Sequence, residues 1–237
     1  VWGGEFILLR RCRAERVARV RPFSLPGGEA AVRDARRVAF ALAQEISQGD
    51  RFAARDLLPA KDAALLATMI ARSLNSPRCS SAGRLFDGIG ALLGLGQRNA
   101  FESQVPLAVE AAAFRHAGPA GAWSFPLRRS ATPGARLEVD WEPAVAALLS
   151  ARPDAAAGAA AFHRGLADAI FAVAREAGVG TVALSGGCFQ NALLATLTAD
   201  ALDAAGFRVL THRLLSPNDN SIAAGQALAA LLNLHTV

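Results

Sequence analysis

Residues 181–226 constrain the fold of this chain more than any other stretch. They read TVALSGGCFQNALLATLTADALDAAGFRVLTHRLLSPNDNSIAAGQ. A short apolar strand (181–184) runs into a Gly-rich turn, and the helix that follows carries leucines at helical spacing. A second strand (207–211) leads to another turn at 217–219, where an Ala-rich helix begins. This order predicts an α/β unit whose turns gather at one end of a parallel sheet.

Both turns of this unit carry residues suited to ligand chemistry. Gly186 and Gly187 let the backbone turn sharply and approach a ligand closely, although an ordinary strand–helix turn explains them equally well. The helix that follows is expected to present free N–H groups and a partial positive charge, which suit phosphate. Asp219 is either a helix cap, which its residue type favours, or a metal ligand. Their placement at one sheet edge predicts a phosphate cradle beside a carboxylate.

The composition sets bounds on size and partners. The 237 residues suffice for one large domain or two lobes, and 52% of them are hydrophobic. Lys+Arg 25 against Asp+Glu 20 gives a net charge of +5, with many arginines near the start of the chain. Aromatic residues are not interleaved with these arginines, so we expect a solvated or covered surface and no nucleic-acid partner.

The cysteines and apolar segments indicate the compartment. Cys12, Cys79 and Cys188 are far apart and form no CxxC pair, which predicts a reducing cytoplasm. No signal peptide and no apolar run of membrane-spanning length is present, which predicts a soluble protein without a membrane partner. The chain begins with Val1 and has Met69 as its single methionine, so we expect a piece of a longer polypeptide.

The rest of the chain alternates between predicted strands and helices. Strands are expected at 6–9, 17–22, 124–128 and 136–139. Helices are expected at 30–48 (ended by Gly49), 61–73, 102–116, 143–150 and 153–177, and around Leu85 to Leu93. The chain shows no internal repeat.

Two polar residues interrupt apolar helix faces, so each needs a partner. Asp87 could pair with Arg84 or Arg36, or bind a ligand hydroxyl, and the residues alone favour the salt bridge. His163 lies beside Phe162, where a hydrogen-bonded core histidine is favoured over a ligand. The sequence has no HxxxH or HExxH motif, so no histidine metal cluster is expected.

The order of motifs resembles the hydrogenase maturation carbamoyltransferases of the HypF family. Residues 80–87 (SSAGRLFD), followed by LLGL at 92–95, are similar to the SSxGRLFD…LLGL segment of that family. Further matches are WGGEF at 2–6, LPGG at 25–28, FESQ at 101–104, SGGCFQN at 185–191, PND at 217–219 and GQ at 225–226. They span the chain in order and correspond to the C-terminal portion of the family's Kae1-like domain.

This resemblance implies the fold and its division. We expect an α/β protein, namely one RNase H-like lobe of the actin/sugar-kinase/heat-shock ATPase fold with helical insertions and an incomplete partner lobe. Residues 1–28 would supply strands of the incomplete first lobe. Residues 29–237 would form the second RNase H-like lobe of a Kae1-like carbamoyltransferase domain, including its helical insertion.

Similarity to the wider Kae1/TsaD family implies roles for individual residues, with the catalytic residues left open. Asp87 and Gln104 would lie at the nucleoside, Asn191 would contact the adenylate, Gly186 and Gly187 would supply backbone near the phosphate, and Asp219 would ligate a divalent metal (Mg, Fe or Zn). Some positions depart from the family pattern. Asn220-Ser221 stands where Gly-Gly is usual, Ser103 replaces a Gly and Phe101 replaces a Tyr.

The function implied by the resemblance is ATP-dependent carbamoyl transfer. HypF-like proteins use ATP and carbamoyl phosphate to make carbamoyl-adenylate. They pass the carbamoyl group to the C-terminal Cys of HypE, on the route to the cyanide ligands of nickel–iron hydrogenase. We therefore expect a carbamoyltransferase fragment with a HypE-like acceptor, inactive alone. A small-molecule O-carbamoyltransferase of the same fold and a non-catalytic nucleotide-binding remnant stay open as alternatives.

Overall fold

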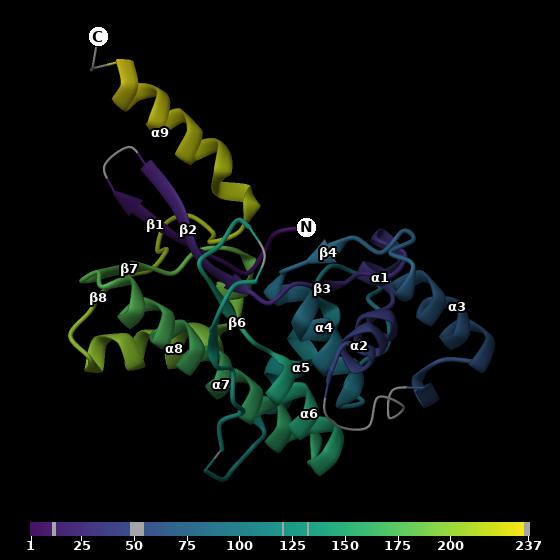
Figure 1. Cartoon of the computed structure of the whole chain (residues 1–237). Coiled ribbons are helices and arrows are strands. Elements are labelled where there is room, and N and C mark those ends of the chain that lie inside the picture. The colour runs from purple at the N-terminus through teal and green to yellow at the C-terminus, as the bar shows by residue number, and fades with distance from the viewer. Residues whose placement is uncertain (11–12, 48–54, 120, 132, 235–237) are drawn as a thin grey trace.

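The computed structural model describes residues 1–10, 13–47, 55–119, 121–131 and 133–234. Helices make up most of the body, and the strands of these residues form three small sheets (Figure 1). Cys12, and the Gln48 and Gly49 that were predicted to end a helix, lie outside the described residues.

The strands are β1 (Glu5–Arg10), β2 (Arg13–Val20), β3 (Phe23–Ser24), β4 (Arg78–Cys79), β5 (Leu127–Arg129), β6 (Leu137–Val139), β7 (Thr181–Ala183) and β8 (Arg208–Leu210). The α-helices are α1 (Glu29–Arg33), α2 (Ala35–Gln44), α3 (Ala60–Ala71), α4 (Ala82–Leu92), α5 (Gln104–Phe114), α6 (Glu142–Ala151), α7 (Ala155–Ala177), α8 (Ala192–Ala204) and α9 (Ile222–Leu234). Short 3₁₀ turns are η1 (Arg55–Leu57), η2 (Gly187–Gln190) and η3 (Asp219–Ser221). The helices α3, α5, α6 and α7 begin and end within about two residues of the predicted bounds, the usual uncertainty of helix ends.

The predicted helix at 30–48 is wrong, because two helices stand there. Asp34 adopts an extended conformation (φ −118°, ψ 92°) and caps α2, accepting a hydrogen bond from the Arg36 amide. A short acidic side chain competes with the helix for backbone N–H groups and so favours such a break. The second helix ends at Gln44.

The core forms around α7, which contacts both α5 and α8, while α4 packs against α2 and α5. Phe162 of α7 meets the rings of Phe86 and Phe125 edge to face, with centroids 4.8 Å and 5.8 Å away. Aromatic pairs in this geometry add stability beyond their buried area. These contacts place the first half of α4 against the middle of α7.

Two glycines allow α4 to approach its neighbours closely. A Cβ atom at Gly88 would lie 2.5 Å from the Leu42 side chain of α2, and one at Gly90 would lie 2.4 Å from Val105 of α5. Both distances are shorter than a van der Waals contact, so larger residues would push the helices apart. Gly88 and Gly90 therefore set how closely α4 packs against α2 and α5.

The largest sheet has the order β1-β2-β6-β5. β1 and β2, which cover the strands predicted at 6–9 and 17–22, pair antiparallel. β2 pairs parallel with β6 from Ala18↔Leu137 to Val20↔Val139. Strands from residues 1–28 thus share one sheet with strands from 127–139. The assignment of 1–28 to a first lobe stays a prediction.

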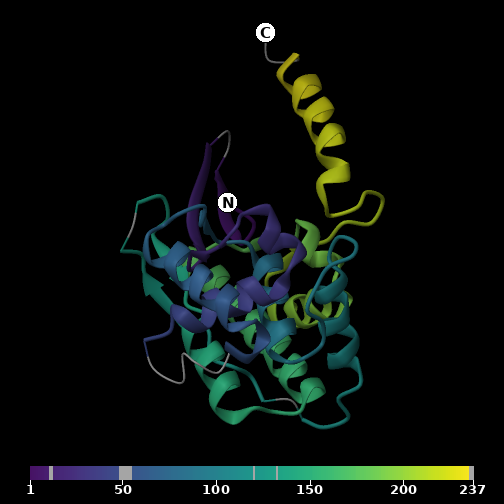
Figure 2. The same ribbon diagram turned by 90° about the vertical axis from the view of Figure 1, so that its right-hand side faces the viewer.

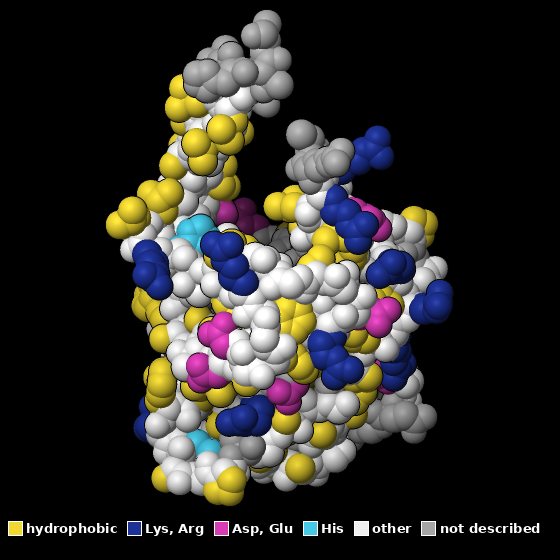
Figure 3. Space-filling model, turned by 90° about the vertical axis from the view of Figure 1, so that its left-hand side faces the viewer, with side chains coloured by type: hydrophobic (Ala, Val, Ile, Leu, Met, Phe, Trp, Pro, Cys, Tyr) yellow, Lys and Arg dark blue, Asp and Glu magenta, His cyan; other side chains and the backbone are white. Residues whose placement is uncertain are grey.

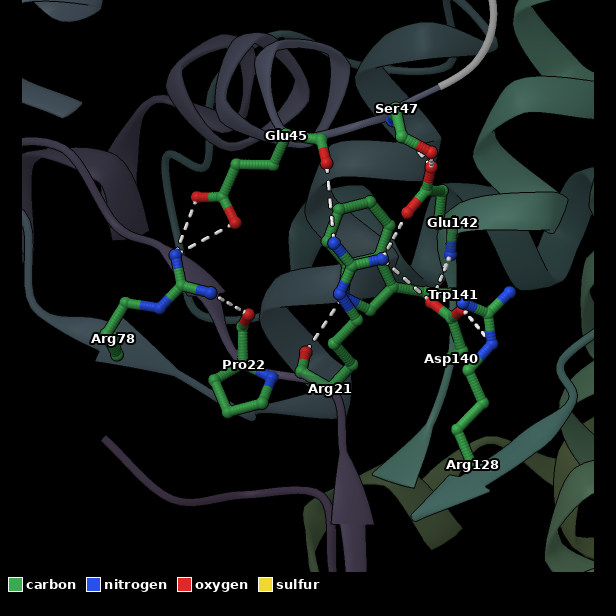
Figure 4. Close-up of polar contacts among 9 residues, drawn as sticks. All are labelled: Arg21, Pro22, Glu45, Ser47, Arg78, Arg128, Asp140, Trp141 and Glu142. Carbon is green, nitrogen blue, oxygen red and sulfur yellow. Dashed lines mark hydrogen bonds and ion pairs between the residues drawn. The ribbon is translucent and has the colours of Figure 1, made fainter. Parts of the chain in front are cut away.

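A polar network joins this sheet to the helices (Figure 4). Arg21, just after β2, donates to Asp140 (2.9 Å) and Glu142 (2.5 Å). The Trp141 indole N–H donates to the Arg21 carbonyl (2.8 Å), and the Arg21 guanidinium lies 4.8 Å from the Trp141 ring centroid. The other Asp140 oxygen lies 2.8 Å from Nε of Arg128, an ion pair without the alignment of a hydrogen bond. Asp140 is fully buried, so these cations balance a charge that water cannot reach.

The Glu142 carboxylate completes the network at the end of α2. It accepts hydrogen bonds from the Ser47 amide (2.5 Å) and the Ser47 hydroxyl. Burial raises the pKa of the Glu142 carboxyl, but the bonds from Ser47 and Arg21 outweigh it and lower the pKa to about 2. Glu142 therefore keeps its charge in solutions acidic enough to protonate an ordinary glutamate.

Helix α9 projects away from the body in both ribbon views, and the β1–β2 hairpin projects from the same side (Figure 1, Figure 2). Ile222, Leu228, Leu231 and Leu232 of this helix are more than half exposed. Figure 3 shows hydrophobic side chains along the projecting helix, while basic and acidic side chains are interspersed over the body on that face. Among the described residues, no helix has the length and apolar character needed to cross a membrane.

Candidate nucleotide and metal site

The Gly186 turn and the 217–219 turn meet, as the sequence predicted. β7 and β8 pair in parallel, so the ends of both strands lie at one edge. The Gly186 amide donates to the Pro217 carbonyl (2.8 Å), and a Cβ atom at Gly187 would lie 3.9 Å from Cβ of Asn218. Gly186 has φ 97° and ψ 157°, a conformation that residues other than glycine rarely adopt. The turn continues into η2, whose N-terminus is not capped by a described side chain.

Asp219 does not cap the last helix, which corrects the reading favoured by its residue type. The cap of η3 is Asn218, whose side chain accepts from the Asn220 amide (3.1 Å). Asp219 is exposed, and its side chain makes no hydrogen bond or ion pair with the other described residues. The Ser221 hydroxyl donates to the Ser216 carbonyl (2.6 Å) and closes the loop.

Among the residues that the structure describes, no group of three or more His, Cys, Asp or Glu side chains could hold a metal ion. Divalent cations take four or more ligands, so Asp219 can supply only part of a site, which other groups or water would complete.

The N-terminus of α8 is already occupied, so the prediction of free N–H groups there is wrong. Asn191 caps the helix by accepting from the Leu194 amide (2.8 Å). The Glu110 carboxylate of α5 accepts from the Ala192 amide (2.6 Å) and the Leu193 amide (3.3 Å). A carboxylate at a helix N-terminus satisfies both the unpaired amides and the helix dipole. No motif in the sequence marks Glu110, which lies 82 residues before Ala192.

His163 is a hydrogen-bonded core histidine, as predicted, and its partner is a candidate site residue. The ring is fully buried, with Nδ1 at 2.7 Å from the Ala159 carbonyl and Nε2 at 2.8 Å from Nδ2 of Asn191. Burial lowers the pKa of His163, against the raising effects of the Ala159 carbonyl, Glu110 and Asn191. The ring is therefore neutral at neutral pH.

Asp87 is fully buried on α4 and paired within the protein. Its Oδ1 accepts from Nδ2 of Asn99 (2.9 Å), and its Oδ2 lies 2.6 Å from Arg84 in an ion pair without hydrogen-bond alignment. Arg36, the other predicted partner, binds Asp34 instead (2.7 Å). The salt-bridge interpretation is thus confirmed for Arg84. Contact between Asp87 and a nucleoside stays a prediction.

The η2 turn lies close to this ion pair. A Cβ atom at Gly83, in the first turn of α4, would lie 3.9 Å from Sγ of Cys188. Burial raises the pKa of the Cys188 thiol to about 11, with smaller influences from Arg84 and Asp87. The structure thus brings together the Gly186–Gly187 turn, Asp87 and Asn191.

Gln104 is the first residue of α5. Its Oε1 accepts from the Ala100 amide (2.7 Å), and Asn99 holds the same loop by accepting from the Val105 amide (2.9 Å). Ser103 adopts the left-handed region (φ 64°), which costs a residue other than glycine on the order of 1 kcal/mol or more. Asn99 was not singled out in the sequence, where no motif distinguishes it from other loop asparagines.

A pocket of about 520 Å³ opens beside this loop. Its polar lining consists of Arg33, Asp34, Arg37, Arg98, Asn99 and Gln104. Asp34 is bound to Arg36, Arg33 pairs with Glu29, and Arg98 lies 3.9 Å from Asp34. The rim therefore favours polar ligands. Gln104 and Asn99 therefore line this pocket, whereas Asp87 is not part of the lining and is reached through its hydrogen bond with Asn99.

Replacing Asp87 with asparagine should not destabilise the chain at neutral pH. Burial raises the pKa of Asp87 to about 6, against the lowering effects of Arg84 and Asn99. The folded state thus binds a proton more tightly than the unfolded state, so the wild type loses stability as pH rises from about 4 to 6. Thermal melts at pH 4 and pH 7.5 should show that the Tm of the Asp87→Asn variant, relative to that of the wild type, is higher at pH 7.5 than at pH 4. A fall of several degrees at pH 7.5, with an Asp168→Asn control unchanged, would establish the ion pair as a stabilising one.

Comparison with known proteins covers almost the whole chain. Residues 1–226 match the family described as carbamoyltransferase, Kae1-like domain, second subdomain. Carbamoyltransferase HypF of Rhodobacter capsulatus is 37% identical over 242 residues, covering 100% of this chain and 31% of that protein. Carbamoyltransferase HypF of Synechocystis sp. is 34% identical over 249 residues, covering 98% of this chain and 32% of that protein.

A solved structure agrees in fold. The crystal structure of full-length HypF in the phosphate- and nucleotide-bound form matches with a TM-score of 0.83 and 25% identity, over 97% of this chain and 30% of that chain. Fold and sequence together define a carbamoyltransferase subdomain with the Kae1-like ATPase fold, which confirms the predicted α/β class. The chain belongs to the HypF family. It spans about a third of the length of these relatives.

Proposed function

We propose that this chain is the nucleotide-binding C-terminal part of a HypF-type enzyme that uses ATP and carbamoyl phosphate. Through carbamoyl-adenylate, the enzyme would carbamoylate the C-terminal Cys of a HypE-like acceptor in nickel–iron hydrogenase maturation. The observation that carries the proposal is the contact between the Gly186 turn and the Asp219 loop, in a chain matched to the family from residue 1 to 226. A thiol acceptor requires a reducing compartment, which supports the cytoplasm.

The proposed roles follow the geometry. Gly187 would offer its backbone amide to phosphate, and Gly186, whose own amide is bonded to the Pro217 carbonyl, would let the phosphate approach the turn closely. Asn191 lies at the start of the next helix for the adenylate. Gln104 lines the pocket beside Asp87, where the nucleoside would lie. Asp219 would supply one ligand of a divalent cation, whose charge would neutralise the phosphates.

Carbamoyl transfer needs more than these residues. Attack by a thiolate on carbamoyl-adenylate requires the sulfur to be held against the carbamoyl carbon, over the face of its carbonyl group, while the C–O bond to AMP breaks and AMP leaves. This chain offers backbone and side chains for the adenylate. The regions of the relatives that this chain does not cover would bind the acceptor and supply the remaining metal ligands.

The test is a transfer assay with this chain alone and with the chain inside a full-length HypF polypeptide. Each is mixed with ATP, carbamoyl phosphate, Mg²⁺ and an acceptor ending in Cys, and the acceptor mass is followed. We expect no transfer by the chain alone and one carbamoyl group added by the longer polypeptide. Failure of the longer polypeptide would contradict the proposal. Transfer to a small hydroxyl compound in place of the thiol would favour the O-carbamoyltransferase alternative.

A further inference from the structure

Asn191 is held from inside the protein by His163, which lies 28 residues earlier on α7. The Ala159 carbonyl can only accept a hydrogen bond, so Nδ1 of His163 carries the ring proton and donates to it (2.7 Å). Nε2 of the neutral ring then offers a lone pair. It accepts from the Asn191 NH₂ group at 2.8 Å.

The other end of the Asn191 carboxamide is fixed as well. Its Oδ1 accepts from the Leu194 amide (2.8 Å). A 180° flip of the carboxamide would place its NH₂ group against the Leu194 N–H and its oxygen against the histidine lone pair, so both bonds would be lost. The two contacts together allow one orientation.

The histidine ring is itself immobilised. It is fully buried, and the rings of Phe86 and Phe162 pack edge to face on it, with centroids at 5.2 Å and 6.0 Å. Asn191 is partly exposed, whereas His163 has no access to solvent or to a ligand. Any influence of His163 on a ligand must therefore pass through Asn191.

We propose that His163 is a positioning residue: it takes one N–H of the Asn191 carboxamide and fixes its orientation, leaving the second N–H as the donor for a ligand. The ligand atom that meets this N–H is then a hydrogen-bond acceptor, such as a ring nitrogen or a ribose or phosphate oxygen of a nucleotide. This inference rests on the proposed function, in which Asn191 contacts the adenylate.

The test compares the 237-residue chain with its variants His163→Leu, His163→Gln and Asn191→Ala, and with the double variant His163→Leu/Asn191→Ala. Affinity for ATP with Mg²⁺ is measured by calorimetry, and exchange of the Asn191 side-chain NH₂ protons by NMR. Leucine fills the apolar site but offers no acceptor. Glutamine offers both an acceptor oxygen for Asn191 and a donor for Ala159.

We expect His163→Leu to weaken binding about 10-fold, the effect of one lost hydrogen bond, and His163→Gln to recover most of it. In the Asn191→Ala background, His163→Leu should have no further effect, because its influence passes through Asn191. Additive losses in the double variant, or a stable His163→Gln variant that does not recover binding, would make His163 merely structural and overturn the proposal.

Failure of the proposed function is distinguishable from failure of this inference. If the wild-type chain binds no nucleotide, the nucleotide role of this chain alone is contradicted, and the NMR measurement decides the inference. Slow NH₂ exchange of Asn191 in the wild type and His163→Gln, with fast exchange in His163→Leu, supports positioning. Equal exchange in all of them rejects it.

Discussion

Asp219→Ala is expected to abolish metal-dependent nucleotide binding in a full-length HypF polypeptide that contains this chain, with little effect on its fold. The side chain is exposed and makes no hydrogen bond or ion pair with the other described residues, so little stability depends on it. Its loop touches the Gly186 turn, and carboxylate oxygens are preferred ligands of hard divalent cations. A cation on Asp219 could therefore bridge to phosphate held by that turn.

Gly186→Val should weaken nucleotide binding at the same site by blocking the phosphate, where Asp219→Ala removes the metal ligand. Gly186 has φ 97°, which a β-branched residue resists, and a Cβ atom there would meet no other described residue within 4 Å beyond its chain neighbours. The added side chain would project into the open space beside the turn, where a phosphate would approach. The double variant should bind no more weakly than either single variant, because each change breaks the bridged site.

Calorimetry with ATP, with and without Mg²⁺, measures both effects, and thermal melts check the fold. Asp203→Ala is the matched control, since Asp203 is an exposed carboxylate near the other end of α8. Unchanged Mg²⁺-dependent affinity in Asp219→Ala, or additive losses in the double variant, would contradict the shared site.

Asp140→Ala should be the most destabilising single change in the polar network of Figure 4. It leaves the partly buried Arg21 with one carboxylate in place of two and removes the ion-pair partner of Arg128. Removal of one partner from a buried ion pair costs about 3–5 kcal/mol. For a chain of this size, that corresponds to a fall in Tm on the order of 10 °C.

Thermal melts of the chain alone measure this effect, with Asp168→Ala as the control. Asp168 is exposed on α7, and its replacement should change the stability by less than about 0.5 kcal/mol. If Asp140→Ala has the same Tm as the Asp168→Ala control, the ion pairs of the network do not hold the sheet to the helices. The packing of Trp141 would then hold them together without these ion pairs.

Much of the fold follows from local patterns in the sequence. Local patterns along the chain predicted α3, α5, α6 and α7 to within about two residues. Two strands that each run into a turn predicted the parallel pairing of β7 with β8. The break at Asp34 was missed because the helical pattern continues through it, while one side chain redirects the backbone. Helical periodicity averages over several residues, so a single cap is easily hidden in it.

The sequence by itself determined the family and the meeting of the two turns, because motif order is read along the chain and parallel strands end at one edge. Only the tertiary structure decided the partners of the site residues. Glu110 fills the N-terminus of α8, and His163 holds Asn191, across 82 and 28 residues of chain. Hydrogen bonds act over about 3 Å, and packing of helices, not sequence spacing, brings such groups within that distance.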